Sequence, residues 1–344
     1  MKTKWGVWGS GGIARRRTIP EGIVAAGNAE LTAVYDVNAE VNNQVAEEFD
    51  VVACDTEDAL LESDCEIIYV ATPANTHCGQ VIRAAQAGKH VLCEKPLGMD
   101  VEEAERMIAA CEDNGVKLGT AFMMRFHAQH QEALKLVREG MIGTPVLARA
   151  QLSCWYPPIP GAWRQYPEQS GGGSLMDMGG HCIDLLEMFY GRAQRVQCLI
   201  GNLVHDYPSE DTAVVILEFE NGAKGMVDNL FNVPDSSSKN RLELYGSRGS
   251  ILAEGTIGQG EIGEMTAYLE SGDTGYEAKQ ARTGGSGIAI TPDPLNMYRA
   301  EVEAFARAVV SDREPPVSAD DGLWSQRVLA ACYEAAKTGC AVSL

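Results

Sequence analysis

The chain has 344 residues, 45% of them hydrophobic, which predicts a globular protein of about two domains. Its net charge of −20 disfavours nucleic-acid and membrane-surface binding, because phosphate backbones and anionic lipids are themselves negative. The ten cysteines form no CxxC pair, so we expect free thiols and neither disulfides nor a metal site. The N-terminus enters a strand pattern directly and no apolar run reaches about 18 residues, so we expect a cytoplasmic protein without a membrane span.

The first strand pattern, Lys4 to Trp8, ends in a glycine turn at residues 9–14 of the form GxGxxA. Such a turn lets a helix follow the strand closely and lets the backbone approach a pyrophosphate. The next strand pattern ends in Asp36, where an acidic residue binds ribose hydroxyls and repels a 2′-phosphate; the alternative for Asp36 is a turn cap. These features predict an NAD site that includes Gly9, Gly11, Gly12, Ile13 and Asp36.

Three consecutive arginines, residues 15–17, follow the glycine turn. They could meet a pyrophosphate or a 2′-phosphate, or they could form a solvated helix face. We therefore expect NAD and leave NADP open. Pro20 lies inside the same predicted helix and indicates that the helix breaks or restarts there.

Strands then alternate with helices. Short apolar strands are expected at 51–53, 66–71, 90–93 and 116–122, and helices at 56–61, 76–87 and 100–114. Asp100 and Glu103 have the spacing of a capping box. This alternation predicts an α/β fold with a parallel, doubly wound sheet that binds ligands at the carboxyl ends of its strands.

The turn Glu94-Lys95-Pro96 follows one of these strands. A lysine at that edge, beside a nicotinamide, could bind a substrate hydroxyl and stabilise the alkoxide that develops from it. The alternative is an ordinary surface lysine at a turn. The proline raises the chance of a cis peptide bond.

After Phe122 the pattern changes. A link at 123–127 and a helix at 128–139 precede a strand at 145–155, a proline-rich loop at 156–161 and a helix at 175–190. We then expect further strands at 196–203, 213–219, 225–231, 241–245, 250–253 and 264–269. Asn221-Gly222 predicts a hairpin turn between two of them, and the stretch 255–287 is glycine-rich and predicts loops. Two closing helices are expected at 292–310 and 320–338. We expect a dinucleotide-binding domain over residues 1–123 and an antiparallel sheet backed by helices over residues 124–344.

The helix at 175–190 follows three glycines, residues 171–173, and carries Asp177 and His181 on one face. Imidazole can take a proton from an alcohol near neutral pH, and a carboxylate one turn away can orient the ring. The alternative is a helix cap at Asp177 and a satisfied core histidine at His181.

In this order the motifs resemble the glucose-fructose oxidoreductase / inositol dehydrogenase (Gfo/Idh/MocA) family over nearly the whole chain. They are the glycine turn at 9–14, Ala71 to His77, Lys89 to Leu97, Trp163-Arg164, and the glycines at 171–173 followed by Asp177, His181 and Asp184. The resemblance implies a Rossmann domain, then an α/β domain with a large open, mostly antiparallel sheet. It also implies an NAD(P)-dependent dehydrogenase or reductase of sugars or cyclitols.

The resemblance further implies the roles of single residues. The implied catalytic residues are Lys95, Asp177 and His181. The implied cofactor contacts, beyond the glycine turn and Asp36, are Thr72, Pro73, Asn75, His77, Glu94 and Lys95. The implied substrate pocket contains Asp177 and His181 together with Arg125, Tyr156, Trp163, Arg164 and Asp184.

The family also implies a homodimer or homotetramer that assembles through the open sheet, and a small sugar or polyol as the binding partner. The arginines at 15–17 and the prolines at 157–160 depart from its pattern. The arginines leave the choice between NAD and NADP open, and the prolines leave the identity of the substrate open. Two alternatives stay open: an NADP-preferring aldose–ketose oxidoreductase or dihydrodiol dehydrogenase, and a non-catalytic dinucleotide-sensing regulator.

Overall fold

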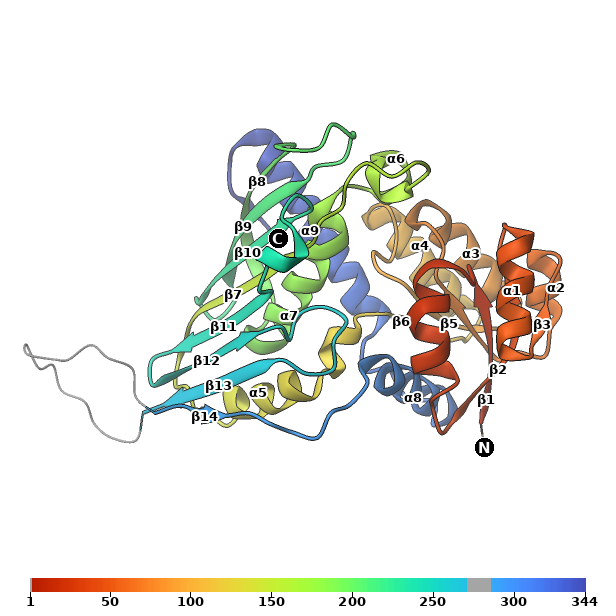
Figure 1. Cartoon of the computed structure of the whole chain (residues 1–344), viewed down its shortest axis with the longest axis horizontal. Helices are drawn as coiled ribbons and strands as arrows, with labels where there is room; N and C mark the ends of the chain where they lie inside the picture. Colours follow the sequence, from red (N-terminus) through yellow and green to blue (C-terminus); the bar gives the residue numbers. More distant parts are fainter. Residues whose placement is uncertain (1, 271–285) are drawn as a thin grey trace, which may run out of the picture.

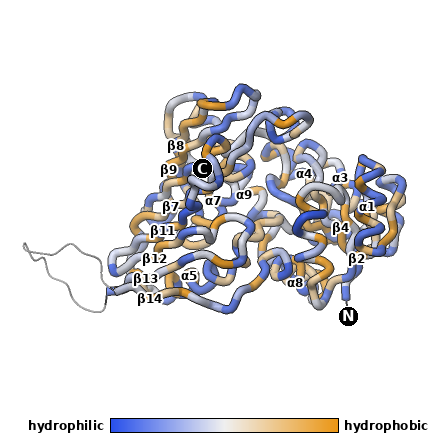
Figure 2. Tube along the Cα trace, viewed as in Figure 1, coloured by the Kyte–Doolittle hydropathy of each residue, from blue (hydrophilic) through white to orange (hydrophobic). Residues whose placement is uncertain are grey.

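The computed structural model describes residues 2–270 and 286–344 and contains two sheets side by side (Figure 1). Part of the glycine-rich stretch expected to form loops, residues 271–285, lies outside the described residues. Figure 2 shows hydrophobic segments along the strands and more hydrophilic ones along the outer helix α1 (Ala39–Phe49). Within the described ranges, none of the helices has the length and apolarity that crossing a membrane requires.

The first sheet is the parallel, doubly wound sheet that the sequence predicted. Its six strands lie in the order β3-β2-β1-β4-β5-β6, and every pair is parallel. The strands are β1 (Thr3–Trp8), β2 (Ala29–Tyr35), β3 (Val52–Ala53), β4 (Ile67–Val70), β5 (His90–Cys93) and β6 (Leu118–Thr120). The order reverses between β1 and β4, and ligands of such sheets bind at this point, outside the carboxyl ends of the strands.

The α-helices that connect these strands are α1, α2 (Glu57–Glu62), α3 (Ala74–Gln86) and α4 (Val101–Asp113). All but α3 begin at a residue whose side chain caps the helix. The Asp100 side chain accepts from the backbone N–H of Glu103 at 2.8 Å, as expected of a cap. The Glu103 carboxylate accepts from Met99 at 2.9 Å, one residue earlier than a capping box places it.

The prediction that Pro20 breaks the first helix is wrong. Helix η1 runs from Ala14 to Ile23 as a π-helix with Pro20 inside it. Its wider turns bond each N–H to the carbonyl five residues earlier, as Val24 does to Ile19 at 2.9 Å. A π-turn therefore accommodates a proline ring that an α-helix would not.

The second sheet is mixed and mostly antiparallel. Within the described residues it has nine strands in the order β14-β13-β12-β11-β7-β10-β9-β8-β15, of which only β7 and β10 pair in parallel. Gly222, with φ of +86°, forms the expected hairpin turn between β9 and β10. The strands are β7 (Pro145–Ser153), β8 (Ala193–Gly201), β9 (Thr212–Phe219), β10 (Lys224–Leu230), β11 (Arg241–Gly246), β12 (Gly249–Glu254), β13 (Glu264–Leu269), β14 (Ile288–Ala289) and β15 (Val342–Ser343).

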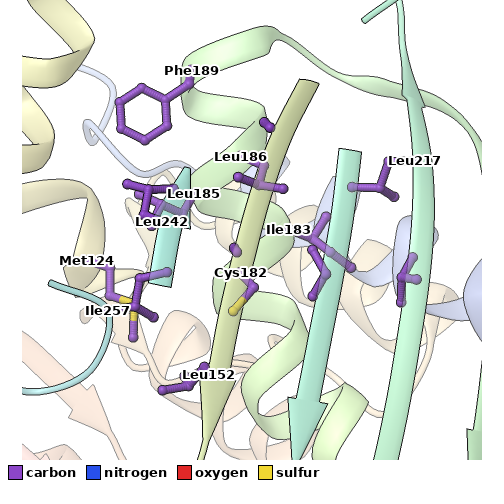
Figure 3. Close-up of a cluster of buried hydrophobic side chains, with 14 of the residues drawn as sticks. Met124, Leu152, Cys182, Ile183, Leu185, Leu186, Phe189, Leu217, Leu242 and Ile257 are labelled. Carbon is purple, nitrogen blue, oxygen red and sulfur yellow. The ribbon is translucent and has the colours of Figure 1, made fainter. Parts of the chain in front are cut away.

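Helices cover one face of this sheet, the face toward the first sheet (Figure 1). The long ones are α5 (Ala128–Arg138), α7 (Gly180–Tyr190) and α9 (Ala319–Thr338). This part of the chain also contains short helical segments, which are η2 (Met123–Phe126), η3 (Trp163–Gln165), α6 (Pro167–Ser170), η4 (Leu175–Gly179) and η5 (Asp235–Ser237). Figure 3 shows Ile183, Leu185 and Leu186 of α7 beside the strands of the sheet. They belong to the same buried cluster as Leu217 and Leu242, and this core holds α7 in place.

Helix α8 (Met297–Val310) comes late in the chain but returns to the first sheet. Phe305 packs edge-on against Trp5 of β1 at 6.0 Å, and Val302 belongs to the same buried cluster. Helix α8 therefore completes the hydrophobic core around β1, although it lies about 290 residues later in the sequence. The division of the chain into two domains after residue 123 stays a prediction.

Candidate active site

A cavity of about 570 Å³ opens between the two sheets. The first sheet contributes the glycine turn and the segments after β4 and β5, while the second contributes the end of β7 together with η4, α7 and loops. The lining includes the cofactor-side residues Gly12, Ile13, Arg16, Ala71, Thr72, Glu94 and Lys95, and the far-side residues Met123, Met124, Leu152, Ser153, Cys154, Trp163, Arg164, Asp177, Met178, His181, Asp235, Ser238, Asn240, Gly258, Gln259 and Tyr298.

The three residues expected to be catalytic all line this cavity. Lys95, in the turn after β5, donates from Nζ to Oδ1 and to the backbone oxygen of Asp177, each at 2.8 Å. Arg164 donates from Nε to the same Oδ1 at 3.0 Å and stacks on the Trp163 ring. Burial would raise the pKa of Asp177, but the charges of Lys95 and Arg164 outweigh burial and lower it below its ordinary value. The lysine turn of the first sheet is thereby tied to the helix of the second.

His181 is only 7% exposed, and its ring meets Phe122 edge-on with centroids 5.8 Å apart. Its Nδ1 has no hydrogen-bond partner among the described residues, so it is not the satisfied core histidine of the alternative interpretation. Burial, followed by the Lys95 ammonium, lowers the pKa of His181 well below its usual value. The ring is neutral near pH 7 and can accept a proton.

Asp177 does not cap a helix, as the other alternative required. It lies inside η4, a π-helical segment that continues directly into α7, and its side chain bonds Lys95 and Arg164. Such π-segments are frequent at functional sites. Asp177 and His181 still face the same cavity.

Glu94 lies on the cofactor side of the cavity and belongs to a buried chain of hydrogen bonds. Tyr69 donates its hydroxyl hydrogen to Glu94, and Thr18 of η1 donates to the Tyr69 oxygen at 2.9 Å. Burial raises the pKa of Glu94, with the Lys95 charge acting against this. These hydrogen bonds link η1, β4 and the turn after β5, and they fix the Glu94 carboxyl group at the edge of the cavity.

The glycine turn has the shape that a dinucleotide requires. Gly9, with φ of +88°, passes so close to Ala71 and Thr72 that a Cβ would overlap them, whereas a Cβ on Gly12 would meet open space. Asp36 accepts from the N–H groups of Gly11 at 3.0 Å and Asn38 at 2.9 Å. Its carboxylate thus braces the turn and retains lone pairs for ribose hydroxyls.

The arginines at 15–17 have three different surroundings. Arg15 pairs with Glu48 at 2.9 Å and Arg17 with Glu21 at 2.6 Å, on the protein surface. Arg16 donates to the carbonyl oxygen of Gly12 at 3.1 Å and lines the cavity. Two of the three charges are therefore already compensated by glutamates.

Several predicted cofactor residues do not line the cavity: Gly9, Gly11, Asp36, Pro73, Asn75 and His77. His77 is 1% exposed, and its ring lies between the carbonyl oxygens of Thr72, at 2.9 Å, and Pro96, at 3.0 Å. It holds together the two turns that carry Thr72 and Lys95, the second of which contains the cis Lys95–Pro96 peptide bond. Asn75 is exposed in the first turn of α3 and, like Pro73, does not line the cavity.

Arg125 and Asp184 also lie outside the lining of the cavity. Arg125 makes a bidentate pair with Asp184, at 2.9 and 3.0 Å from its Nε, and contacts Asp321 of α9 at 3.2 Å. Asp184 lies one turn after His181 on α7. This buried ion pair joins the link, α7 and α9, and its geometry is that of a structural contact. Tyr156, too, is outside the lining.

The sequence pattern did not point to several lining residues. Tyr298 reaches the cavity because α8 folds back onto the first domain, and Asn240 and Ser238 come from a loop between β10 and β11. No local motif marks these residues, because only strand pairing and helix packing bring them to the site.

A Rossmann sheet, a glycine turn with an acidic residue after β2, and a lysine–aspartate–histidine set in one cavity define a nicotinamide-dependent oxidoreductase. The chain belongs to the GFO/IDH/MocA family. Residues 3–122 match the model of the "Oxidoreductase family, NAD-binding Rossmann fold", and residues 130–252 match the "GFO/IDH/MocA C-terminal domain".

Relatives cover the whole chain. The D-xylose 1-dehydrogenase (NADP(+)) 2 of Haloferax volcanii is 31% identical, over 99% of both chains. The 1,5-anhydro-D-fructose reductase of Ensifer adhaerens is 28% identical, over 99% of this chain and 98% of its own. The crystal structure of the aldose-aldose oxidoreductase from Caulobacter crescentus, complexed with glycerol, is 29% identical and superposes over 100% of both chains with a TM-score of 0.88.

Proposed function

We propose that the protein reversibly oxidises a ring hydroxyl of a sugar or cyclitol, with NAD as the hydride acceptor. The observation that carries this proposal is the convergence of Lys95, Asp177 and His181 on one cavity that also reaches the glycine turn. The named activities of the relatives, which act on xylose and anhydrofructose, support the substrate class.

His181 is the general base of the proposed reaction. Its ring is neutral and lines the cavity, so it can take the hydroxyl proton as the C–H bond breaks. In the reverse direction the imidazolium returns the proton to the carbonyl oxygen. NAD, held at the glycine turn and Asp36, would supply the hydride acceptor at its nicotinamide ring, and the products would be a ketone or lactone, NADH and a proton.

Lys95 holds the reacting oxygen. Its ammonium already donates to Asp177, and a third N–H can be directed at the substrate oxygen, where it stabilises the developing negative charge. Asp177 fixes the position of that ammonium from one side while Arg164 holds the carboxylate from the other. Asp177 and Arg164 thus orient the Lys95 ammonium before the substrate binds.

The geometry of the glycine turn supports binding of NAD to the first domain. The turn has open space beside Gly12, and Asp36 follows the end of β2. A carboxylate there favours ribose hydroxyls over a 2′-phosphate, and Arg15 and Arg17 are paired with glutamates. We therefore propose a preference for NAD. The relative named for NADP makes NADP the alternative to be measured beside it.

The remaining lining supports a polyol. Ser238 and Asn240 contribute hydroxyl and amide groups to the lining, and Trp163 contributes an aromatic ring. A sugar ring has the same two kinds of surface, with hydroxyl groups at its edge and C–H bonds on its faces.

The test is a panel of sugars, polyols and cyclitols, read as NADH absorbance in the oxidising direction with NAD⁺ and NADP⁺ in parallel. His181→Ala and Lys95→Ala should lower turnover by roughly 10²–10⁴-fold, which is far more than they lower NAD⁺ affinity. Arg327→Ala, which removes an exposed ion pair with Glu105 far from the cavity lining, is the matched control. Absence of turnover across the panel would favour a dinucleotide-sensing regulator, and tighter NADP⁺ binding would overturn the Asp36 argument.

We also propose that the open face of the second sheet mediates self-association. Leu147, Ile216 and Leu199 project from that face and are 37%, 47% and 70% exposed. Exposed apolar side chains on a broad sheet are typical of an interface between subunits. Ile216→Lys should reduce the mass measured by light scattering if the wild type is an oligomer, and a wild-type monomer would contradict the proposal.

A further inference from the structure

The three glycines before the catalytic helix, residues 171–173, have no part in the reaction proposed above. Their geometry shows what they accommodate. A Cβ on Gly173 would lie 2.0 Å from the backbone oxygen of Glu210, and one on Gly172 would lie 1.8 Å from the hydroxyl oxygen of Tyr333. Both glycines are therefore required by close packing against these two residues.

The helix that follows does not cap itself. Ser174 is its N-cap residue, but its side chain makes no capping hydrogen bond, and its Oγ has no partner among the described residues. A helix N-terminus leaves several backbone N–H groups without partners inside the helix, and leaving them unpaired in a buried place is costly.

Glu210 supplies the missing cap from another part of the chain. Its carboxylate accepts from Gly173 at 2.8 Å and from Leu175 at 3.0 Å, and its backbone oxygen accepts from Ser174 at 2.9 Å. Three successive N–H groups therefore bind one residue, 35 positions after Leu175 in the sequence.

Tyr333 of α9 fixes this carboxylate. Its hydroxyl donates to Oε1 of Glu210 at 2.9 Å. Glu210 is 7% exposed and forms no ion pair within the described residues, so the helix N-terminus and Tyr333 are what hold it there. The bonds of Glu210 to residues 173–175 and to Tyr333 thus fix the N-terminal end of this helix against α9.

The catalytic residues depend on this end. The N–H of Asp177 bonds the carbonyl oxygen of Gly173 at 2.9 Å, so the first turn that Glu210 holds is the turn that carries Asp177. His181 follows one turn later on the same continuous helix. A shift of the helix start would move both side chains relative to Lys95, which is anchored on the other sheet.

We propose that Glu210, held by Tyr333, is a positioning residue for catalysis that sets the location of Asp177 and His181, with the glycines at 172 and 173 making room for it. This inference rests on the proposed function. Neither Glu210 nor Tyr333 lines the cavity, so an effect on turnover must pass through the helix. A misplacement of about 1 Å at a catalytic group can cost about 10²-fold in rate.

The test compares Glu210→Ala, Glu210→Gln and Tyr333→Phe with the wild type on the best substrate of the panel. The alanine variant loses all side-chain acceptors, whereas glutamine retains one acceptor oxygen. We expect kcat to fall about 10²-fold in Glu210→Ala, about tenfold in Glu210→Gln and severalfold in Tyr333→Phe. The Kd of NAD⁺, measured by fluorescence, should stay within about twofold, because the glycine turn is unaffected.

Asp211→Asn is the matched control. Asp211 is the next residue, is fully buried, and accepts from the backbone N–H groups of Leu203, Val204 and His205, each at 2.9 Å. It stabilises a loop that does not line the cavity. We expect Asp211→Asn to lower the melting temperature about as much as Glu210→Gln while keeping nearly wild-type kcat.

Equal kcat losses at equal losses of melting temperature in Glu210→Gln and Asp211→Asn would overturn the inference, because Glu210 would then have only a structural role. So would wild-type kcat in Tyr333→Phe, which serves as the decisive variant if Glu210→Ala does not fold. Failure of the proposed function is separate, since it would show as absence of turnover in the wild type itself.

Discussion

The buried histidine pair beside the interdomain link makes the protein sensitive to acid. His127 and His130 are 0% exposed, with ring centroids 4.6 Å apart. Three of their four ring nitrogens have no partner among the described residues, and the fourth lies 2.9 Å from the carbonyl oxygen of Met124. Burial lowers the pKa of His127 to about 4 and, with the charge of His127, that of His130 to about 3.

The sign and size of the effect follow from these values. Between about pH 6.5 and the folded-state pKa, the unfolded chain binds more protons than the folded one, so the free energy of unfolding falls as the pH falls. From pH 7 to pH 4.5 each histidine should lower it by about 2.5 kcal/mol, and the pair by about 5 kcal/mol. Buried carboxyl groups with raised pKa, such as Glu187 at about 7, act in the opposite direction.

The assay is urea unfolding at pH 7 and pH 4.5, read by tryptophan fluorescence. Because other groups titrate too, the informative quantity is the difference between wild type and His127→Leu. This variant should reduce the pH-dependent loss by about 2.5 kcal/mol, and His130→Leu should do the same. The reasoning is refuted if both variants lose as much stability as the wild type between the two pH values.

Other predictions concern charged groups. Asp177→Asn should lower turnover at least about 10²-fold with little change in the Kd of NAD⁺, and an equal loss of NAD⁺ affinity would contradict its role. Asp36→Ser should raise the ratio of kcat/KM for NADP⁺ to that for NAD⁺ at least about tenfold in initial-rate assays; an unchanged ratio would show that Asp36 does not select the cofactor. Arg125→Met leaves Asp184 buried without its cation, so the free energy of unfolding in urea should fall by about 3–5 kcal/mol. The exposed pair of Lys4 and Asp64 is the control, since solvent screens it and Lys4→Met should leave the free energy of unfolding nearly unchanged. A similar cost in both variants would show that burial of the Arg125 pair is unimportant.

Local patterns were sufficient for the first domain. The alternation of apolar strands and capped helices predicted the parallel sheet, because each βα unit folds by short-range rules of period and capping. Pro20 was the exception, since a π-turn is a response to packing that a sequence window does not reveal. In the second domain most strands were predicted, but the two-residue strands β14 and β15 were missed, because only pairing with a neighbour makes such short segments strands.

The sequence by itself indicated the side chains that we propose for the chemistry, because Lys95, Asp177 and His181 stand in recognisable motifs. Only the tertiary structure decided what these residues contact and which others serve them. The ion pair between Lys95 and Asp177 spans 82 positions, and the cap from Glu210 to Leu175 spans 35. Such contacts depend on how two sheets pack, and packing is a collective property of many buried side chains that no local spacing encodes.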